Sequence, residues 1–218
     1  MQEPYGYDSP DALEQIFRGK INWVNLLIIA VNILVYVVME ILGDTEDAAF
    51  MLKCGAAYTP WILEGQWYRL FTSMFLHFGI EHLFNNMLLL LFLGDTLEEI
   101  VGKWKYLVIY IGGGMAGNLL SVVMDCRSGS AAVSAGASGA VFAVIGGILI
   151  ILVKNGGRLQ QITASRLLLM IGLSIYHGFR SVGIDNAAHI GGVLAGALLT
   201  LVSYKKPCVR NNTGADEW

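Results

Sequence analysis

The sequence carries little charge for its length. Of its 218 residues, 14% are charged and 55% are hydrophobic, whereas a soluble globular chain usually has about 25% charged residues. This balance predicts a polytopic membrane protein. The formal net charge is −3 at pH 7, so the sequence lacks the basic excess that marks nucleic-acid-binding proteins. We therefore expect no nucleic-acid partner.

Motifs for metals, cofactors and disulfide frameworks are also lacking. The three cysteines are Cys54, Cys126 and Cys208, and they form no C-x-x-C pair of the kind that indicates a zinc ribbon. There is no H-E-x-x-H sequence, and no Gly-Lys-Ser/Thr follows the glycines at 112–114. The sequence therefore predicts no metal and no cofactor, and it leaves open whether Cys54 and Cys126 pair.

Long apolar runs dominate what is present. The N-terminus is polar and acidic, without the basic and then apolar pattern of a signal peptide. A membrane helix needs about 20 apolar residues, and the candidate spans are 21–42, 73–94, 104–125, 138–153, 166–183 and 187–204. We expect an all-α membrane domain of six helices at 21–204, with short cytoplasmic tails at 1–20 and 205–218.

The distribution of lysine and arginine predicts the orientation. With the N-terminus in the cytoplasm, the outside segments hold only Lys53, Arg69, Arg127 and Arg180, and the other ten of the 14 basic residues lie inside. The positive-inside rule then favours two cytoplasmic termini, which an even number of spans also requires. The longest outside connection is 43–72, and its Trp61, Trp67, Tyr68 and Arg69 suit the lipid headgroup region.

Polar residues in the second span form the first candidate site. His82 and Asn86 are four positions apart, about 400° of helix rotation, so they share one face. His77 and His82 are five apart, which in one continuous helix directs them away from each other and disfavours a metal pair. Polar groups within spans are functional candidates, although this pair can also simply bond neighbouring helices.

Ser138 opens the fourth span within the sequence SAGASGAVF. Residues 138–153 rise about 24 Å as a helix, which is shorter than the hydrocarbon core of about 30 Å. Ser138 then starts below the outer surface, where the free N–H groups of a helix N-terminus can stabilise an oxyanion. Small residues and serine also occur here simply because they let membrane helices pack closely.

His189 opens the sixth span on the same side as Ser138. Gly192 and Gly196 follow on its helical face, and this G-x-x-x-G spacing favours close approach to a second small-residue helix. The segment 136–140 is the expected partner. The imidazole would then lie near the serine hydroxyl, which needs a base to act as a nucleophile.

These residues resemble the motifs of the rhomboid family of intramembrane serine proteases. Trp67-Tyr68-Arg69 is similar to the family's W-R loop motif, and His82-x-x-x-Asn86 to its H-x-x-x-N motif. Gly136-Ala137-Ser138-Gly139 resembles the G-x-S-G nucleophile motif, and Ala188-His189-x-x-Gly192-x-x-x-Gly196 resembles the sixth helix. The four motifs occur in the family's order over roughly residues 60–200.

The resemblance implies a six-helix core with a water-filled cavity open to the outside. Ser138 would be the nucleophile and His189 the general base and acid, without a carboxylate partner. His82, Asn86 and the Ser138 N–H would form the oxyanion site. Asp185 lies in the loop before the sixth helix and would not belong to a triad.

The resemblance also assigns supporting roles. Glu98 would be a structural carboxylate, Arg69 would hold the 43–72 connection, and His77 would brace that connection. Phe142 stands where many relatives have a tyrosine, and its ring should still stack on His189.

The implied partners are the lipid bilayer and the transmembrane segments of client proteins, cut near their outer ends. The implied location is the plasma membrane of a bacterium. The sequence indicates no oligomeric state. Two other functions remain open. A catalytically silent relative would bind client helices, although such proteins typically lack the serine or the histidine. A small transporter would show an internal repeat, and we find no convincing one.

Overall fold

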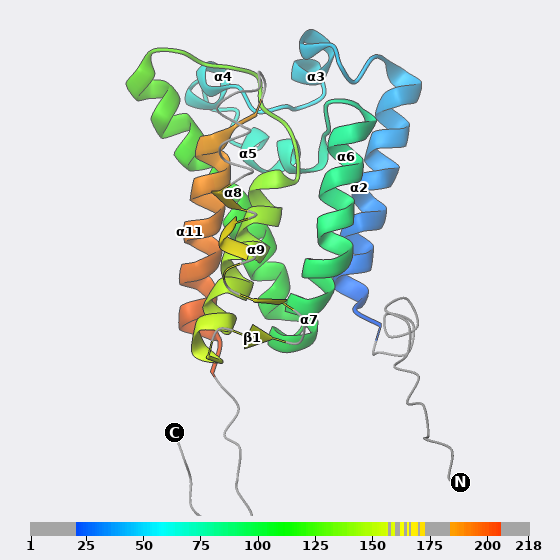
Figure 1. Cartoon of the computed structure of the whole chain (residues 1–218). Coiled ribbons are helices and arrows are strands. Elements are labelled where there is room, and N and C mark those ends of the chain that lie inside the picture. Colours follow the sequence, from blue (N-terminus) through cyan, green and yellow to red (C-terminus); the bar gives the residue numbers. More distant parts are fainter. Residues whose placement is uncertain are drawn as a thin grey trace, which may run out of the picture.

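The computed structural model describes residues 21–156, 158–159, 162–163, 165, 167–169, 171–172 and 184–205. These residues form a helical bundle, drawn upright in Figure 1. The long helices are α2 (Trp23–Leu42), α6 (Gly79–Leu89), α8 (Lys103–Ser128), α9 (Ser138–Lys154) and α11 (Asn186–Ser203). The shorter elements are α3 (Ala48–Lys53), α4 (Thr59–Leu63), α5 (Arg69–Thr72), η1 (Ser73–Phe75), η2 (Leu90–Gly94), α7 (Asp95–Val101), β1 (Arg158–Leu159) and β2 (Ile162–Thr163).

The expected spans are confirmed in part. Among the described residues, helices α2, α8 and α11 are long and apolar enough to cross a membrane, and the number is four if the bent pair Arg69–Phe75 and Gly79–Val101 counts as one span. The apolar α9 has 17 residues. Most of the span expected at 166–183 lies outside the described residues, so the count of six is not confirmed. Where the structure describes the chain, the regular elements are helical apart from the two-residue strands β1 and β2, which pair antiparallel.

The second span differs from its predicted bounds of 73–94. The helix begins at Gly79 and continues through the π-helical η2 to Val101, while residues 69–75 form a separate helical segment at 91° to it. Gly79 takes a φ of +71°, a conformation that glycine adopts at little cost. The chain therefore turns sharply at Gly79 where the apolar pattern reads as continuous.

Glu98 explains why the second span extends past its charged residues. Its side chain is only 2% exposed, and its two carboxylate oxygens accept the backbone N–H groups of Val24 and Asn25, at 3.2 and 2.6 Å. Those N–H groups belong to the first turn of α2, where a negative charge is stabilising. The predicted structural role of Glu98 is thus confirmed as a cap on α2.

Helix α9 lies at the centre of the bundle. Twelve of its residues are buried, whereas α2 and α11 keep large apolar side chains such as Leu34 and Leu198 exposed, as lipid-facing helices do. Glycines set the close contacts around α9. A Cβ atom at Gly192 would overlap the carbonyl oxygen of Gly139, and one at Gly196 would overlap that of Ala143. The predicted approach of α11 to the 136–140 segment is confirmed.

The upper end of the bundle in Figure 1 is covered by the 43–72 connection, which includes α3 and α4. Arg69 holds this connection. Its guanidinium donates to the carbonyl oxygens of Leu52 (2.8 Å) and Ala56 (2.7 Å) and lies 4.6 Å from the ring centroid of Trp61. The predicted role of Arg69 is confirmed.

Candidate active site

Ser138 is the first residue of α9, and its side chain is partly exposed. Figure 1 shows that α9 begins lower in the bundle than the upper ends of α2, α6 and α8, at the foot of the loop formed by residues 129–137. The first N–H groups of a helix have no partner within it. Ser138 therefore combines an accessible hydroxyl with free N–H donors at the positive end of a helix dipole.

The loop before Ser138 is fixed from two sides. The N–H of Gly136 donates to the carbonyl of Ser73 at 2.9 Å, and the N–H of Ala137 donates to Nε2 of His77 at 3.3 Å. Ser134 forms an antiparallel bridge with Ala57 of the 43–72 connection. His77 therefore braces the 129–137 loop, and its expected bracing of the 43–72 connection stays a prediction.

Gly136 brings the loop against the second span. Its φ is +145°, a conformation that side chains rarely adopt. A Cβ atom there would also lie 2.5 Å from Cε1 of His82. The ring of His82 therefore lies directly beside the backbone two residues before Ser138.

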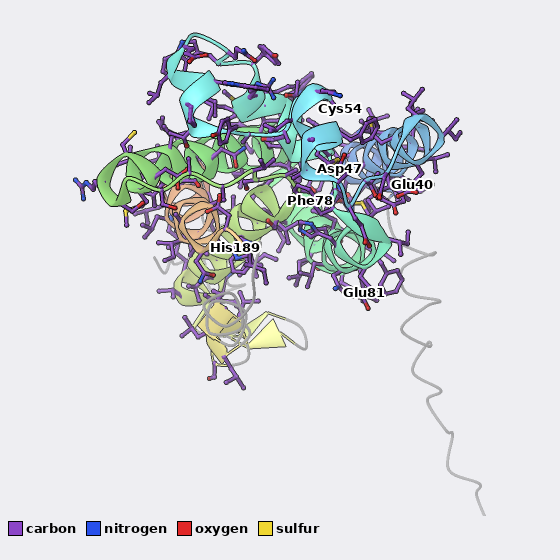
Figure 2. All side chains as sticks on the ribbon, turned by 90° about the horizontal axis from the view of Figure 1, so that it is seen from above. Glu40, Asp47, Cys54, Phe78, Glu81 and His189 are labelled. Atoms are coloured by element: carbon purple, nitrogen blue, oxygen red, sulfur yellow. The ribbon has the colours of Figure 1, made fainter. Side chains whose placement is uncertain are left out.

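His189 lies in the first turn of α11 and is only 7% exposed. Seen from above in Figure 2, it lies beside α11. Its imidazole stacks on Phe142, with ring centroids 4.2 Å apart and planes within 6°. Phe142 is one turn after Ser138 on the same face of α9. The structure thus brings the His189 ring to the face that carries the Ser138 hydroxyl, and the predicted stacking is confirmed.

The prediction that His77 and His82 face away from each other is wrong. Their rings meet edge to face, with centroids 5.3 Å apart. The prediction assumed one continuous helix, but His77 precedes the turn at Gly79 and is not part of α6. Within the described ranges, no group of three or more His, Cys, Asp or Glu side chains is arranged to hold a metal ion.

Asn86 is buried on the same helix as His82, and its amide donates to the backbone carbonyl of His82 at 3.0 Å. This bond lies within α6 and does not reach Ser138. The oxyanion role expected for His82 and Asn86 stays a prediction.

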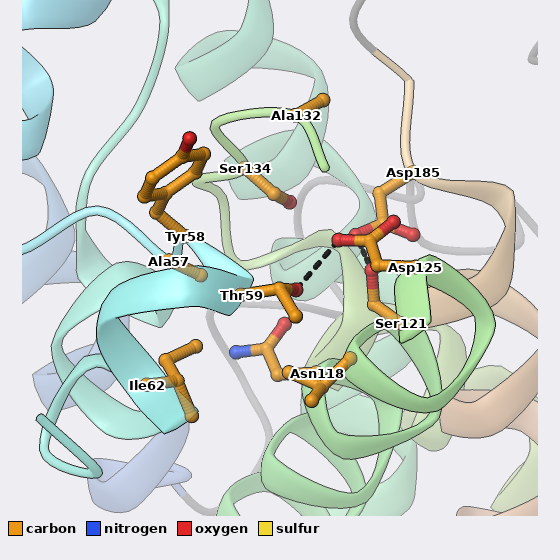
Figure 3. Close-up of a pocket in the computed structure, with 11 residues that line it drawn as sticks. Ala57, Tyr58, Thr59, Ile62, Asn118, Ser121, Asp125, Ala132, Ser134 and Asp185 are labelled. Atoms are coloured by element: carbon orange, nitrogen blue, oxygen red, sulfur yellow. Dashed lines mark hydrogen bonds between the residues drawn. The ribbon is translucent and has the colours of Figure 1, made fainter. Parts of the chain in front are cut away.

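A group of polar side chains beside α11 was not predicted from the sequence. Figure 3 shows Thr59, Ser121, Asp125 and Asp185 around a cavity of about 10 Å³, room for about one water molecule. Thr59 donates to Asp125, and Ser121 donates to Asp185, each at 2.6 Å. These contacts join residues more than 60 positions apart, so no local spacing could have predicted them.

The two described cysteines are free. Cys54 is partly buried and Cys126 is exposed, and burial raises the pKa of the Cys54 thiol. A disulfide between them is not formed here.

Comparisons with known proteins agree with the motifs. A family model described as a rhomboid domain matches residues 64–206. Over 170 residues the chain is 34% identical to the rhomboid protease GluP of Bacillus subtilis, covering 78% of this chain and 32% of that protein. It is 36% identical over 157 residues to RHOMBOID-like protein 5 of Arabidopsis thaliana, covering 71% of this chain and 50% of the relative. It is 31% identical over 207 residues to the rhomboid protease AarA of Providencia stuartii, covering 84% of this chain and 73% of that protein. The chain thus spans about a third of the length of GluP and half of the plant protein.

Proposed function

The chain belongs to the rhomboid family, and on this premise we propose that it is an intramembrane serine endopeptidase using Ser138 and His189. It is an integral multi-pass membrane protein, as its family and its apolar helices indicate. The observation that carries the proposal is the His189 ring stacked at 4.2 Å on Phe142, one helical turn from Ser138.

The proposed chemistry begins with His189 taking the hydroxyl proton of Ser138. The oxygen then attacks the carbonyl carbon of the client peptide, and negative charge develops on the carbonyl oxygen. The N–H of Ser138, with His82 and Asn86, stabilises that charge. As the intermediate collapses, the C–N bond breaks and His189 gives its proton to the leaving amine. Water then hydrolyses the acyl ester by the same steps.

The proposed clients are transmembrane segments, bound from the bilayer and cut near their outer ends after a small residue. An intact helix keeps its carbonyls in internal hydrogen bonds, so a client must unwind locally before Ser138 can attack. We assign the chain to the plasma membrane of a bacterium, with both termini in the cytoplasm and the upper end of Figure 1 outside. The ten inside and four outside basic residues support this orientation.

The alternative is a catalytically silent member that binds client helices. Relatives named as proteases and others named only as rhomboid-like are both similar to this chain. The presence of both Ser138 and His189 in matching motifs favours the protease.

The test is cleavage of a reporter whose transmembrane segment carries Gly or Ser near its outer boundary. The purified wild-type protein should cleave it and should be labelled by a fluorophosphonate. Ser138→Ala should abolish both while leaving the melting temperature in detergent unchanged, because alanine suits a closely packed helix. Cleavage by Ser138→Ala above a trace rate would refute the serine mechanism.

A further inference from the structure

Asp185 binds two other segments with its two carboxylate oxygens. Oδ1 accepts the N–H of Ala188 at 2.8 Å, which caps α11, and Oδ2 accepts the hydroxyl of Ser121 on α8 at 2.6 Å. Figure 3 shows the second bond between the two helices. The residue next to Ala188 is His189, so the capped turn is the one that carries the imidazole.

Within the described residues, no hydrogen bond to Nδ1 orients the imidazole. Its Nδ1 atom is buried and has no partner among the described residues. In a serine protease triad, a carboxylate at this nitrogen sets the orientation of the ring. Among the described residues, the ring stacks on Phe142 and is attached to the first turn of α11, so the orientation of the imidazole depends on how firmly that turn is held.

Contacts along α11 show where its position can change. At the lower end, Lys105 donates to the carbonyl of Ser203 at 3.0 Å, and Lys154 donates to that of Tyr204 at 2.9 Å. In the middle, Gly192 lies against the backbone of Gly139. At the upper end, the Ser121–Asp185 bond joins the first turn to α8. The same turn also packs closely on α8, since a Cβ atom at Gly117 would lie 2.5 Å from the carbonyl oxygen of Ala188. Loss of the Ser121–Asp185 bond therefore leaves this end of α11 held by packing, without the hydrogen bond that fixes its exact position.

We infer that Asp185 and Ser121 are positioning residues for His189, acting through the α11 backbone and without a bond to the imidazole. This inference rests on the proposed function, because it assigns a role in activating Ser138. The Ser121–Asp185 hydrogen bond helps to orient the His189 imidazole, as the carboxylate of a Ser-His-Asp triad does. It acts on His189 only through the peptide backbone.

The experiment compares Ser121→Ala, Asp185→Asn and a matched control, Thr59→Val. The Thr59–Asp125 bond has the same length of 2.6 Å and lies one turn farther along α8. It lines the same cavity as Asp185 but joins α8 to α4, whereas the Ser121–Asp185 bond joins α8 to the start of α11. The readouts are kcat and KM on the reporter, the rate of fluorophosphonate labelling, and the melting temperature, all on the same preparations.

We expect Ser121→Ala to lower kcat and the labelling rate by about 10- to 100-fold with KM nearly unchanged, since a displacement of about 1 Å can cost about 100-fold. Thr59→Val should lower the melting temperature by a similar amount and leave both rates unchanged. Asp185→Asn should stay close to wild type, because its carbonyl can still cap α11 and its amide can donate to Ser121. A true triad carboxylate would instead cost about 10⁴-fold on this change.

Two results would overturn the inference. One is equal rates for Ser121→Ala and wild type, and the other is a loss of the same size in Ser121→Ala and Thr59→Val. A loss of about 10⁴-fold in Asp185→Asn would make Asp185 a triad member and would also refute it. In each case the wild type is still labelled and active, so the proposed function survives. A wild type that neither reacts with the fluorophosphonate nor cleaves the reporter refutes both.

Discussion

At Gly136, a hydrogen atom occupies the place where any other residue carries a carbon. Its φ of +145° and the 2.5 Å that would separate an added Cβ atom from the His82 ring are two separate obstacles to substitution. We expect Gly136→Ala to lower stability by about 1–3 kcal/mol and to abolish turnover, because the ring of His82 or the start of α9 must move.

Gly129 provides the matched control for that substitution. It lies at the start of the same loop with a φ of +69°, and a Cβ atom there would meet nothing within 4 Å. Gly129→Ala should therefore cost about 1 kcal/mol of backbone strain and keep normal turnover. Melting curves and kcat for both variants decide the matter, and full activity in Gly136→Ala would contradict the site geometry.

Asn86 has two candidate roles, which kinetics can separate. As an oxyanion donor, its loss in Asn86→Ala should lower kcat by about 10² to 10³ with little change in KM, because the bond strengthens only in the transition state. As a structural residue, it should change the melting temperature and leave kcat unaltered. The Asn86 amide has two N–H donors, so the one that does not bond the His82 carbonyl at 3.0 Å would donate to the oxyanion in the first case. A lowered melting point with unaltered kcat would remove Asn86 from the site.

Single residues were predicted well where a motif fixed their chemistry. The stacking of Phe142 on His189 and the bonds of Arg69 and Glu98 follow the predicted roles. The contact between His77 and His82 was not predicted because it depends on the backbone turn at Gly79. An apolar stretch that contains one glycine does not indicate whether the chain turns at that glycine.

At the scale of elements, the approach of α11 to α9 sets the position of His189, the proposed base. Gly192 stands against the carbonyl of Gly139, next to Ser138. We expect Gly192→Ala to push the helices apart, lower the melting temperature and reduce kcat by at least about tenfold, since the imidazole moves with α11.

Gly112→Ala is the control for adding a methyl group within the same helical bundle. Its Cβ would meet only Leu199 Cδ1, at 3.4 Å, and alanine favours helix over glycine by up to about 1 kcal/mol. This variant should retain activity and be as stable as wild type or more so. Equal melting temperatures and equal kcat values for Gly192→Ala and Gly112→Ala would show that the close contact at Gly192 does not position His189.

The bounds of the long helices were predicted closely except for the second span. The spans expected at 21–42, 104–125, 138–153 and 187–204 appear as α2, α8, α9 and α11, because each apolar run ends at polar or glycine residues. The second span extends to Val101 because the buried carboxylate of Glu98 is satisfied by α2. The N–H groups that satisfy the Glu98 carboxylate belong to a helix more than 70 positions away, so the sequence around Glu98 does not predict them.

At the scale of the whole molecule, the orientation in the membrane is the main prediction. Ten of 14 basic residues lie on one side in the proposed topology. Alkaline phosphatase fused after residue 218 should be inactive in bacterial cells, and green fluorescent protein at the same place should fluoresce. Phosphatase inserted after Gly65, in the exposed part of the 43–72 connection, should be active. An active phosphatase at the C-terminus would reverse the assignment.

The order of α9 and α11 along the chain has a consequence for biosynthesis. Ser138 is translated before the whole stretch of residues 155–185, and only afterwards does His189 follow on α11. Until that helix enters the membrane, the serine of the proposed mechanism has no base and is a poor nucleophile. On the proposed mechanism, a nascent chain without α11 therefore cannot cut the membrane proteins inserting beside it, and the ability to cut arises only once α11 has been made and inserted.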